Sequence, residues 1–101
     1  ISPSKIENLL CLNEKIKQSF VYGDKKTYLV ALIVSENSEN RKEIEIFLEN
    51  LNKTLSLVEN VKKFKLIEEE FTIDNGMLTP TLKLKRKKIL DKYKDDLEKL
   101  Y

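Results

Sequence analysis

The sequence has neither histidine nor tryptophan, and it has one cysteine among its 101 residues. The single cysteine, Cys11, excludes an internal disulfide bond and fits a reducing compartment. Zinc in proteins is bound mainly by histidine and cysteine, so the near-absence of both argues against a zinc site. We therefore expect no metal site in this chain.

Long apolar runs and a strong charge of one sign are also lacking. The longest apolar run, 28–34, is too short to span a bilayer. The 19 basic and 17 acidic residues leave a net charge of +2, whereas a dedicated nucleic-acid binder is expected to carry a basic excess over the whole domain. The remaining composition, 41% hydrophobic and 36% charged, is typical of one small globular domain.

The residue pattern predicts a small α+β domain with a three-stranded sheet core, formed by a β-hairpin and a further strand. Helices cover the sheet, and the last is amphipathic. The hairpin is the clearest element, because strand-like runs at 16–22 and 27–34 flank the turn signal at 23–26. A helix-start signal lies at 2–7, and further helices are expected at 41–51, at about 54–63 and from about 84 to the end. Short strands are expected at 64–67 and 71–73, with a turn at 74–76.

The segment LTPTLKLKRKK, residues 78–88, has five cations among its last six residues. Lys83 stands between Leu82 and Leu84, which we expect to be packed, so the lysine is held better than one on a free surface. Its ammonium group is a compact charge suited to phosphate or carboxylate oxygens. The alternative is a solvated helix face, which composition alone favours. Against that alternative, cations near a helix N-terminus oppose the helix dipole.

Several short motifs follow one another in an order that resembles a known family. They are SPSKIE at 2–7, the runs FVYGD and YLVALIV at 20–24 and 28–34, VKKFKLI at 61–67, and DNGMLTPTLKLKR at 74–86. In this order they resemble the C-terminal region of AMP-forming long-chain acyl-CoA synthetases, which belong to the adenylate-forming superfamily. The resemblance covers essentially the whole chain.

This resemblance implies that residues 1–101 are the mobile C-terminal lid domain of an ATP-dependent long-chain fatty acid–CoA ligase, without its large N-terminal ATP- and acyl-binding domain. In such enzymes a fatty acid carboxylate attacks the α-phosphate of ATP, and the CoA thiol then displaces AMP from the acyl-adenylate. The adenylation lysine corresponds to Lys83, in a Lys-x-x-Arg motif that Arg86 completes. Thr81 and Leu82 stand where Ser-Gly is commoner, a departure typical of long-chain enzymes. The resemblance thus implies a catalytic Lys83, with Thr81, Leu82 and Arg86 contacting substrate or cofactor.

Further expectations concern ligands and partners. The resemblance implies ATP and CoA as substrates and magnesium as a cofactor of the full-length parent, with none of them bound by this domain alone, which should be inactive. The implied partners are the missing N-terminal domain and the fatty acid, and no nucleic acid. The implied location is cytoplasmic, with the parent peripheral at a membrane. The alternative function is a small module that binds RNA or another acidic partner through the basic patch at 83–88, although no aromatic residue for base stacking lies between Leu82 and Leu90.

Other conspicuous residues have plainer interpretations. Arg86 is expected to brace the Lys83 segment or to pair across a domain interface, and Glu7 to be a helix-cap or interface residue. The three carboxylates at 68–70 are expected at a solvated edge, because consecutive side chains on a strand point to opposite faces. Cys11 is expected to be inert packing.

Overall fold

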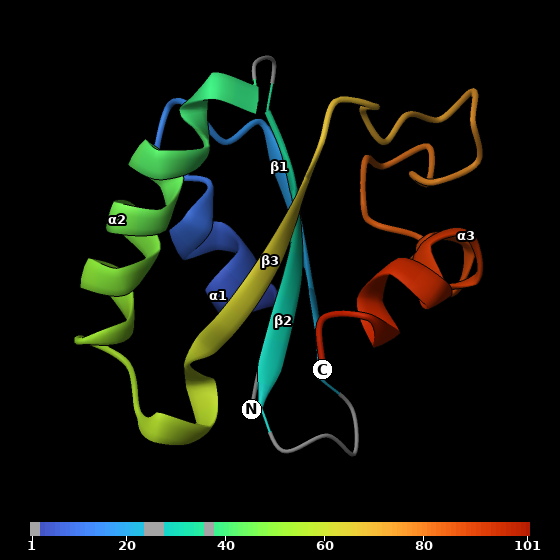
Figure 1. Cartoon of the computed structure of the whole chain (residues 1–101). Helices are drawn as coiled ribbons and strands as arrows, with labels where there is room; N and C mark the ends of the chain where they lie inside the picture. The colour runs from blue at the N-terminus through green and yellow to red at the C-terminus, as the bar shows by residue number, and fades with distance from the viewer. Residues whose placement is uncertain (1–2, 24–27, 36–37) are drawn as a thin grey trace.

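The computed structural model describes residues 3–23, 28–35 and 38–101 and confirms the α+β prediction (Figure 1). Its elements, in chain order, are α1 (Pro3–Leu10), β1 (Gln18–Tyr22), β2 (Leu29–Val34), the 3-10 turn η1 (Ser38–Asn40), α2 (Arg41–Asn52), the 3-10 turn η2 (Leu57–Glu59), β3 (Val61–Ile67) and α3 (Arg86–Glu98). The sheet order is β1-β2-β3, with β1 antiparallel and β3 parallel to β2.

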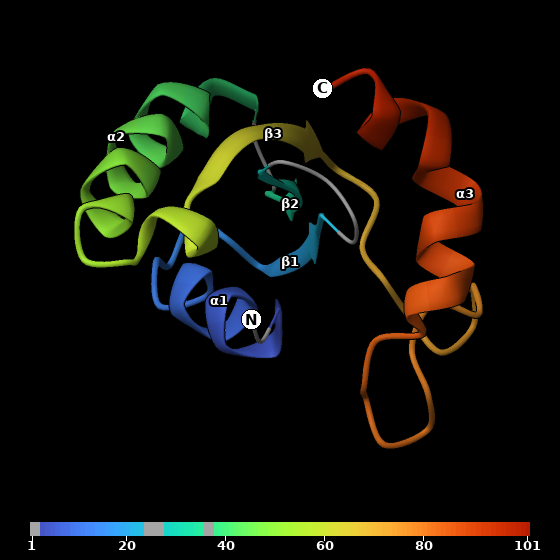
Figure 2. The ribbon, with the colours of Figure 1, turned by 90° about the horizontal axis from the view of Figure 1, so that it is seen from below.

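The central strand β2 separates two hydrophobic clusters. All six of its residues, LVALIV, are buried, as expected for a strand that is apolar on both faces. Ala31 and Ile33 pack in one cluster with residues of α1 and α2, whereas Val30 and Leu32 pack in the other with residues of α3. Figure 2 shows this arrangement, with α1 and α2 on one side of the sheet and α3 on the other. The domain therefore has three layers, and α3 is the helix of the third layer, where residues of the segment before it also pack.

The helix predicted at about 54–63 is wrong. Only the short turn η2 forms there, and β3 begins at Val61, three residues earlier than the predicted strand. The cause is the side chain of Asn52, the last residue of α2. Its Nδ2 donates to the carbonyl of Val61 at 2.9 Å, and its Oδ1 accepts from the Val61 amide at 3.0 Å. This amide pair fixes Val61 in extended backbone, and β2 then pairs with β3 from Val61 to Ile67, with a register shift that leaves Lys62 out of the pairing.

The short strand predicted at 71–73 is also absent from the described structure. The backbone of Phe71 pairs instead with the side chain of Gln18, since its amide donates to Oε1 at 2.7 Å and its carbonyl accepts from Nε2 at 2.9 Å. The turn predicted at 74–76 is confirmed, and Gly76 there has a φ of +79°. The hairpin turn predicted at 23–26 lies largely outside the described residues, and so does Ser2, the first residue of the predicted helix start at 2–7.

The final helix α3 presents the predicted apolar stripe to the sheet. Ile89, Tyr93 and Leu97 are buried, and Leu100 packs beside them as a partly buried residue. Met77 and Leu78, from the segment before α3, belong to the same cluster. The Lys83 segment is thus anchored on both sides by buried residues. No described helix has the length and apolar character that crossing a membrane would require.

Candidate functional site

The Lys83 loop, which we define as residues 79–83, is a tight connection closed by backbone pairing. Leu78 and Leu84 form an antiparallel bridge on either side of it. Within the loop, the amide of Thr79 donates to the carbonyl of Lys83 at 2.8 Å, and the amide of Leu82 donates to the carbonyl of Thr79 at 2.8 Å. The amide of Lys83 donates to Thr79 Oγ1 at 3.1 Å. These bonds give Lys83 a defined backbone position.

Leu82 has the left-handed conformation at the tip of the Lys83 loop, with a φ of +65°. For a residue with a side chain, that conformation costs about 1–2 kcal/mol of conformational free energy, whereas glycine adopts it without this cost. The expectation that Leu82 is packed is wrong, because its side chain is 68% exposed. The turn of the backbone directs it away from the core. Leu84 is partly buried against the α3 cluster, as expected.

Helix α3 begins without the usual local stabilisation. Its N-cap, Lys85, makes no side-chain capping bond, and the first turn contains no acidic residue. The positive end of the helix dipole therefore meets a run of cations at 85–88. Two backbone bonds hold the helix start, from the Lys85 amide to the Met77 carbonyl at 2.8 Å and from the Ile89 amide to the Lys85 carbonyl at 3.1 Å.

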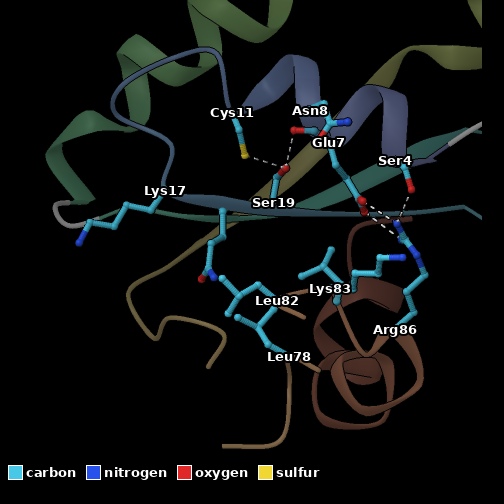
Figure 3. Close-up of a pocket in the computed structure, with 12 residues that line it drawn as sticks. Ser4, Glu7, Asn8, Cys11, Lys17, Ser19, Leu78, Leu82, Lys83 and Arg86 are labelled. Carbon is cyan, nitrogen blue, oxygen red and sulfur yellow. Dashed lines mark hydrogen bonds and ion pairs between the residues drawn. The ribbon is translucent and has the colours of Figure 1, made fainter. Parts of the chain in front are cut away.

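The missing negative charge comes from Glu7 on α1. Arg86 Nη1 donates to Glu7 Oε2 at 2.9 Å and Arg86 Nη2 donates to Oε1 at 2.5 Å, a bidentate pair between residues 79 positions apart (Figure 3). Glu7 is 6% exposed, and its Oε2 also accepts from the Val21 amide at 2.7 Å. The Arg86 guanidinium lies 5.6 Å from the centre of the Phe20 ring. Arg86 therefore pairs within the domain, and the described bonds of the Glu7 carboxylate go to Arg86 and Val21 rather than to the start of α1.

An open cleft of about 640 Å³ lies between α1 and the Lys83 loop. Its lining includes Glu7 on α1, Lys17 before β1, and Leu82, Lys83 and Arg86, and Figure 3 shows these residues around the cleft. Thr81 does not line the cleft. It is exposed, and its Oγ1 lies 2.9 Å from Thr79 Oγ1. The structure thus brings three of the four predicted site residues to one cleft.

Lys83 differs from the cation beside it in the cleft wall. Its side chain is exposed and, within the part of the chain that the structure describes, it has no ion-pair or hydrogen-bond partner. Arg86 is neutralised by Glu7. Lys17 also lines the cleft, but its Nζ donates to Glu70 Oε1 at 3.2 Å. Among the described residues that line the cleft, Lys83 is therefore the lysine whose charge is available to an anion from outside.

The remaining predicted features lie away from this chemistry. Cys11 is exposed just beyond the end of α1, with Sγ 3.5 Å from Ser19 Oγ, so the expectation of a packed cysteine is wrong. The carboxylates at 68–70 are exposed as predicted. Glu69 accepts from Lys92 and from Tyr93, and its pKa is lowered mainly by the bond from Lys92. Among the described residues, no three acidic, histidine or cysteine side chains gather to hold a metal ion.

The sequence interpretation missed the partnership of Glu7 with Arg86. The SPSKIE motif ends at Glu7, and the Lys-x-x-Arg motif ends at Arg86, so the resemblance had singled out both residues. Their contact could not be read from spacing, because it joins the two ends of the chain. The signal was the run of cations at a helix start, which requires a negative charge from elsewhere.

Comparison with known proteins shows the family of the chain. A model of the AMP-binding enzyme C-terminal domain family matches residues 1–101. The chain is 30% identical over 125 residues to long-chain-fatty-acid–CoA ligase FadD15 of Mycobacterium tuberculosis. It is 31% identical over 126 residues to long-chain-fatty-acid–CoA ligase 1 of Homo sapiens. These alignments cover 100% of the chain but 21% and 18% of the relatives, so the chain spans about a fifth of their length.

Solved structures give the same result for the fold. The adenylation domain of the carboxylate reductase from Mycobacterium chelonae superposes with a TM-score of 0.87 at 27% identity, over 100% of this chain and 18% of that one. The A-PCP didomain of carboxylic acid reductase from Segniliparus rugosus, in complex with AMP, superposes with a TM-score of 0.86 at 26% identity, over 100% of this chain and 16% of that one.

Proposed function

Because the chain belongs to the C-terminal domain family of AMP-binding enzymes, we propose that it is the lid of an ATP-dependent long-chain fatty acid–CoA ligase. In this proposal the lid supplies Lys83 for formation of the acyl-adenylate and then rearranges for thioester formation with CoA. The similarity to two long-chain-fatty-acid–CoA ligases over the full length of this chain supports the substrate class. The partner of the lid in this proposal is a larger N-terminal domain of the same protein, since the match covers only 21% and 18% of those relatives.

The observation that carries the proposal is the state of Lys83. It lies on a hydrogen-bonded loop, it is exposed beside a cleft, and no carboxylate of the described chain neutralises it. A lysine held in this way is ready to meet an anion that another domain presents. The exposed Leu82 beside it fits the same interpretation. Burial of this apolar side chain against a partner surface would remove it from water and so favour binding.

The reaction gives such a lysine a specific task. A carboxylate oxygen forms a bond to the α-phosphorus of ATP while the bond to the pyrophosphate oxygen breaks, so two anions must approach one another. Negative charge builds on the equatorial phosphate oxygens, and a preorganised cation in a closed site stabilises it. Delivery by a lid also excludes water from the acyl-adenylate, which water would hydrolyse.

In the second step the CoA sulfur forms a bond to the acyl carbon and AMP leaves. We assign no residue of this chain to CoA. The described residues lack a cluster of metal ligands, and we place any magnesium with ATP on the N-terminal domain. We propose a cytoplasmic enzyme that is peripheral at a membrane, where long-chain fatty acids partition.

The test uses the full-length protein that carries this chain, with Lys83→Ala. The adenylation half-reaction is measured as fatty-acid-dependent exchange of pyrophosphate into ATP, and the second half-reaction as CoA transfer from preformed acyl-adenylate. We expect exchange to fall by roughly two to three decades, as when an oxyanion-hole donor is removed. CoA transfer should be retained.

Lys87→Ala is the matched control, because Lys87 is an exposed lysine in the first turn of α3, four residues after Lys83. It should leave both half-reactions close to their original rates. If Lys83→Ala and Lys87→Ala have equal, small effects on exchange, Lys83 belongs to a solvated face and the proposal is withdrawn. A rise in RNA affinity at low salt that depends on Lys83 and Lys87 alike would favour the basic-patch module instead.

A further inference from the structure

The Lys83 loop ends three residues before the start of α3, so the position of that start affects the direction in which Lys83 points. That start has neither a side-chain cap nor an acidic residue in its first turn, and the cations at 85–88 oppose the helix dipole. The loop itself is held by bonds that lie mostly at the surface. Something outside the segment must therefore keep the helix start, and with it the loop, in one position.

Glu7 has the geometry for this task. Both of its oxygens accept from Arg86, and Oε2 also accepts from the Val21 amide, so the carboxylate is fixed from α3 and from β1 at once. Its neighbours on α1, Ile6 and Leu10, are fully buried, which makes the helix that carries it a rigid base. A planar guanidinium bound at two points cannot turn about the contact.

Arg86 makes two further contacts besides the bidentate contact with Glu7. Nη2 lies 3.3 Å from Ser4 Oγ, one turn before Glu7 on α1. The guanidinium also faces the Phe20 ring of β1. Three points of contact on two elements therefore determine where the first turn of α3 begins, and Lys83 is only three residues away.

We propose that Glu7 is a positioning residue for Lys83, acting through Arg86. The negative charge of Glu7 compensates the cationic start of α3, and the bidentate contact sets the angle at which the Lys83 loop leaves the domain. The effect on the loop stands on the contacts alone, whereas the effect on adenylation rests on the proposed function.

The first test measures amide hydrogen exchange in the 101-residue chain with Glu7→Gln. The glutamine keeps the size of the side chain and an acceptor for Val21, but it removes the charge and one of the two acceptors for Arg86. The reporters are the amides of Leu82 and Lys85, which donate to Thr79 and Met77. We expect both to exchange about tenfold faster, because the local structure opens more often.

Glu69→Gln is the matched control. It makes the same chemical change to another carboxylate that contacts α3, through Lys92 and Tyr93, but at the middle of the helix. It should leave the Leu82 and Lys85 amides within about twofold of their original rates. Arg86→Lys is the second variant if Glu7→Gln does not fold. The lysine keeps the positive charge but cannot bind both Glu7 oxygens in the bidentate geometry of a guanidinium. Unchanged exchange at both amides in Glu7→Gln and Arg86→Lys would overturn the proposal.

The second test uses the full-length enzyme and separates positioning from general support of the fold. Glu7→Gln should lower kcat for pyrophosphate exchange about tenfold, leave KM for ATP within about twofold, and leave CoA transfer from acyl-adenylate unchanged. Adding Arg86→Lys to Glu7→Gln should cause little further loss, because the two residues act as one unit. Equal losses in both half-reactions would show a merely structural role and overturn the proposal.

Lys83→Ala distinguishes failure of this inference from failure of the proposed function. If Lys83→Ala abolishes exchange while Glu7→Gln does not change it, the positioning role is overturned and the lid function stands. If Lys83→Ala leaves exchange intact, the lid function is overturned, and hydrogen exchange alone decides whether Glu7 fixes the loop.

Discussion

Two of the ion pairs on α3 use the same chemistry but differ in their exposure to water. At the helix start, the Glu7 side chain is 8% exposed and that of Arg86 is 40% exposed. At the middle of the helix, the side chains of Lys92 and Glu69 are 46% and 48% exposed. Water and salt screen the second pair but reach the first from one side only. We call the Glu7–Arg86 pair the buried pair, after its buried carboxylate, and the Glu69–Lys92 pair the solvated pair. The buried pair lies beside the candidate site, and the solvated pair lies away from it.

The largest expected effect comes from breaking the buried pair. Glu7→Ala removes the partner of Arg86 and leaves the Val21 amide without an acceptor. We expect the free energy of unfolding to fall by about 3 kcal/mol, the lower end of the range for buried pairs, because the half-exposed guanidinium can regain water. Urea unfolding of the 101-residue chain measures the change. A loss below about 1 kcal/mol would mean that the two pairs are energetically alike.

The second partner of Glu69 sharpens the comparison, because Tyr93 is buried although Glu69 is not. Burial, helped by the bond to Glu69, raises the pKa of Tyr93 from 10.0 to about 12. The unfolded chain therefore loses this proton first, and stability declines as the pH rises from 10 to 12. The contribution of Tyr93 to that decline is about 2 kcal/mol. Urea unfolding at several pH values should show a shallower alkaline decline in Tyr93→Phe. Equal slopes would contradict the assignment.

A smaller effect is expected at Leu82, which lies on the Lys83 loop, just before the end of α3 that carries the buried pair. Its left-handed backbone costs about 1–2 kcal/mol, and Leu82→Gly removes that cost. Glycine gives back part of the gain, because it adds freedom to the unfolded chain. We expect a net stabilisation of about 0.5–1 kcal/mol in thermal or urea unfolding. Leu82→Ala keeps the unfavourable φ and serves as the control, which should not gain stability.

The smallest effect is expected from breaking the solvated pair. Glu69→Gln should cost less than about 1 kcal/mol at neutral pH, and high salt should remove most of the difference. The pKa of Glu69 is lowered in the folded chain, so its contribution exists above the unfolded pKa and disappears as the pH falls through the folded value. Unfolding in low and high salt checks this. A salt-independent loss as large as that of Glu7→Ala would refute the comparison.

Local signals predicted the elements that local forces decide. The hairpin strands follow from their apolar runs, α2 from its helical spacing, and the turn at Gly76 from Asn-Gly, and all three were found within a few residues of their expected bounds. The helix at 54–63 failed because the side chain of Asn52, a tertiary contact, holds Val61 in extended backbone. Propensity alone contains no information about such a bond.

In the candidate site, too, local features were predicted from the sequence and long-range contacts were not. Lys83 was identified by a motif, and the predicted helix from about residue 84 placed it just before a helix start. The packing of Leu82 was predicted wrongly, because the apolar character of a residue does not reveal a left-handed backbone at a turn. The Glu7–Arg86 contact spans 79 positions, and no pattern of near neighbours encodes it.

The two outer strands of the sheet share one device. The side-chain amide of Asn52 pairs with Val61 on β3, and that of Gln18, on β1, pairs with Phe71. Each amide offers one donor and one acceptor, as a peptide group does, so each forms a short imitation of a neighbouring strand. At Val61 the side-chain amide occupies backbone groups on the outer edge of β3, so this edge offers fewer free groups for recruiting other chains into an extended sheet. Deamidation of Asn52 to a carboxylate would replace the donor by a second acceptor. Chemical ageing at Asn52 would then free the Val61 carbonyl at the sheet edge for another chain.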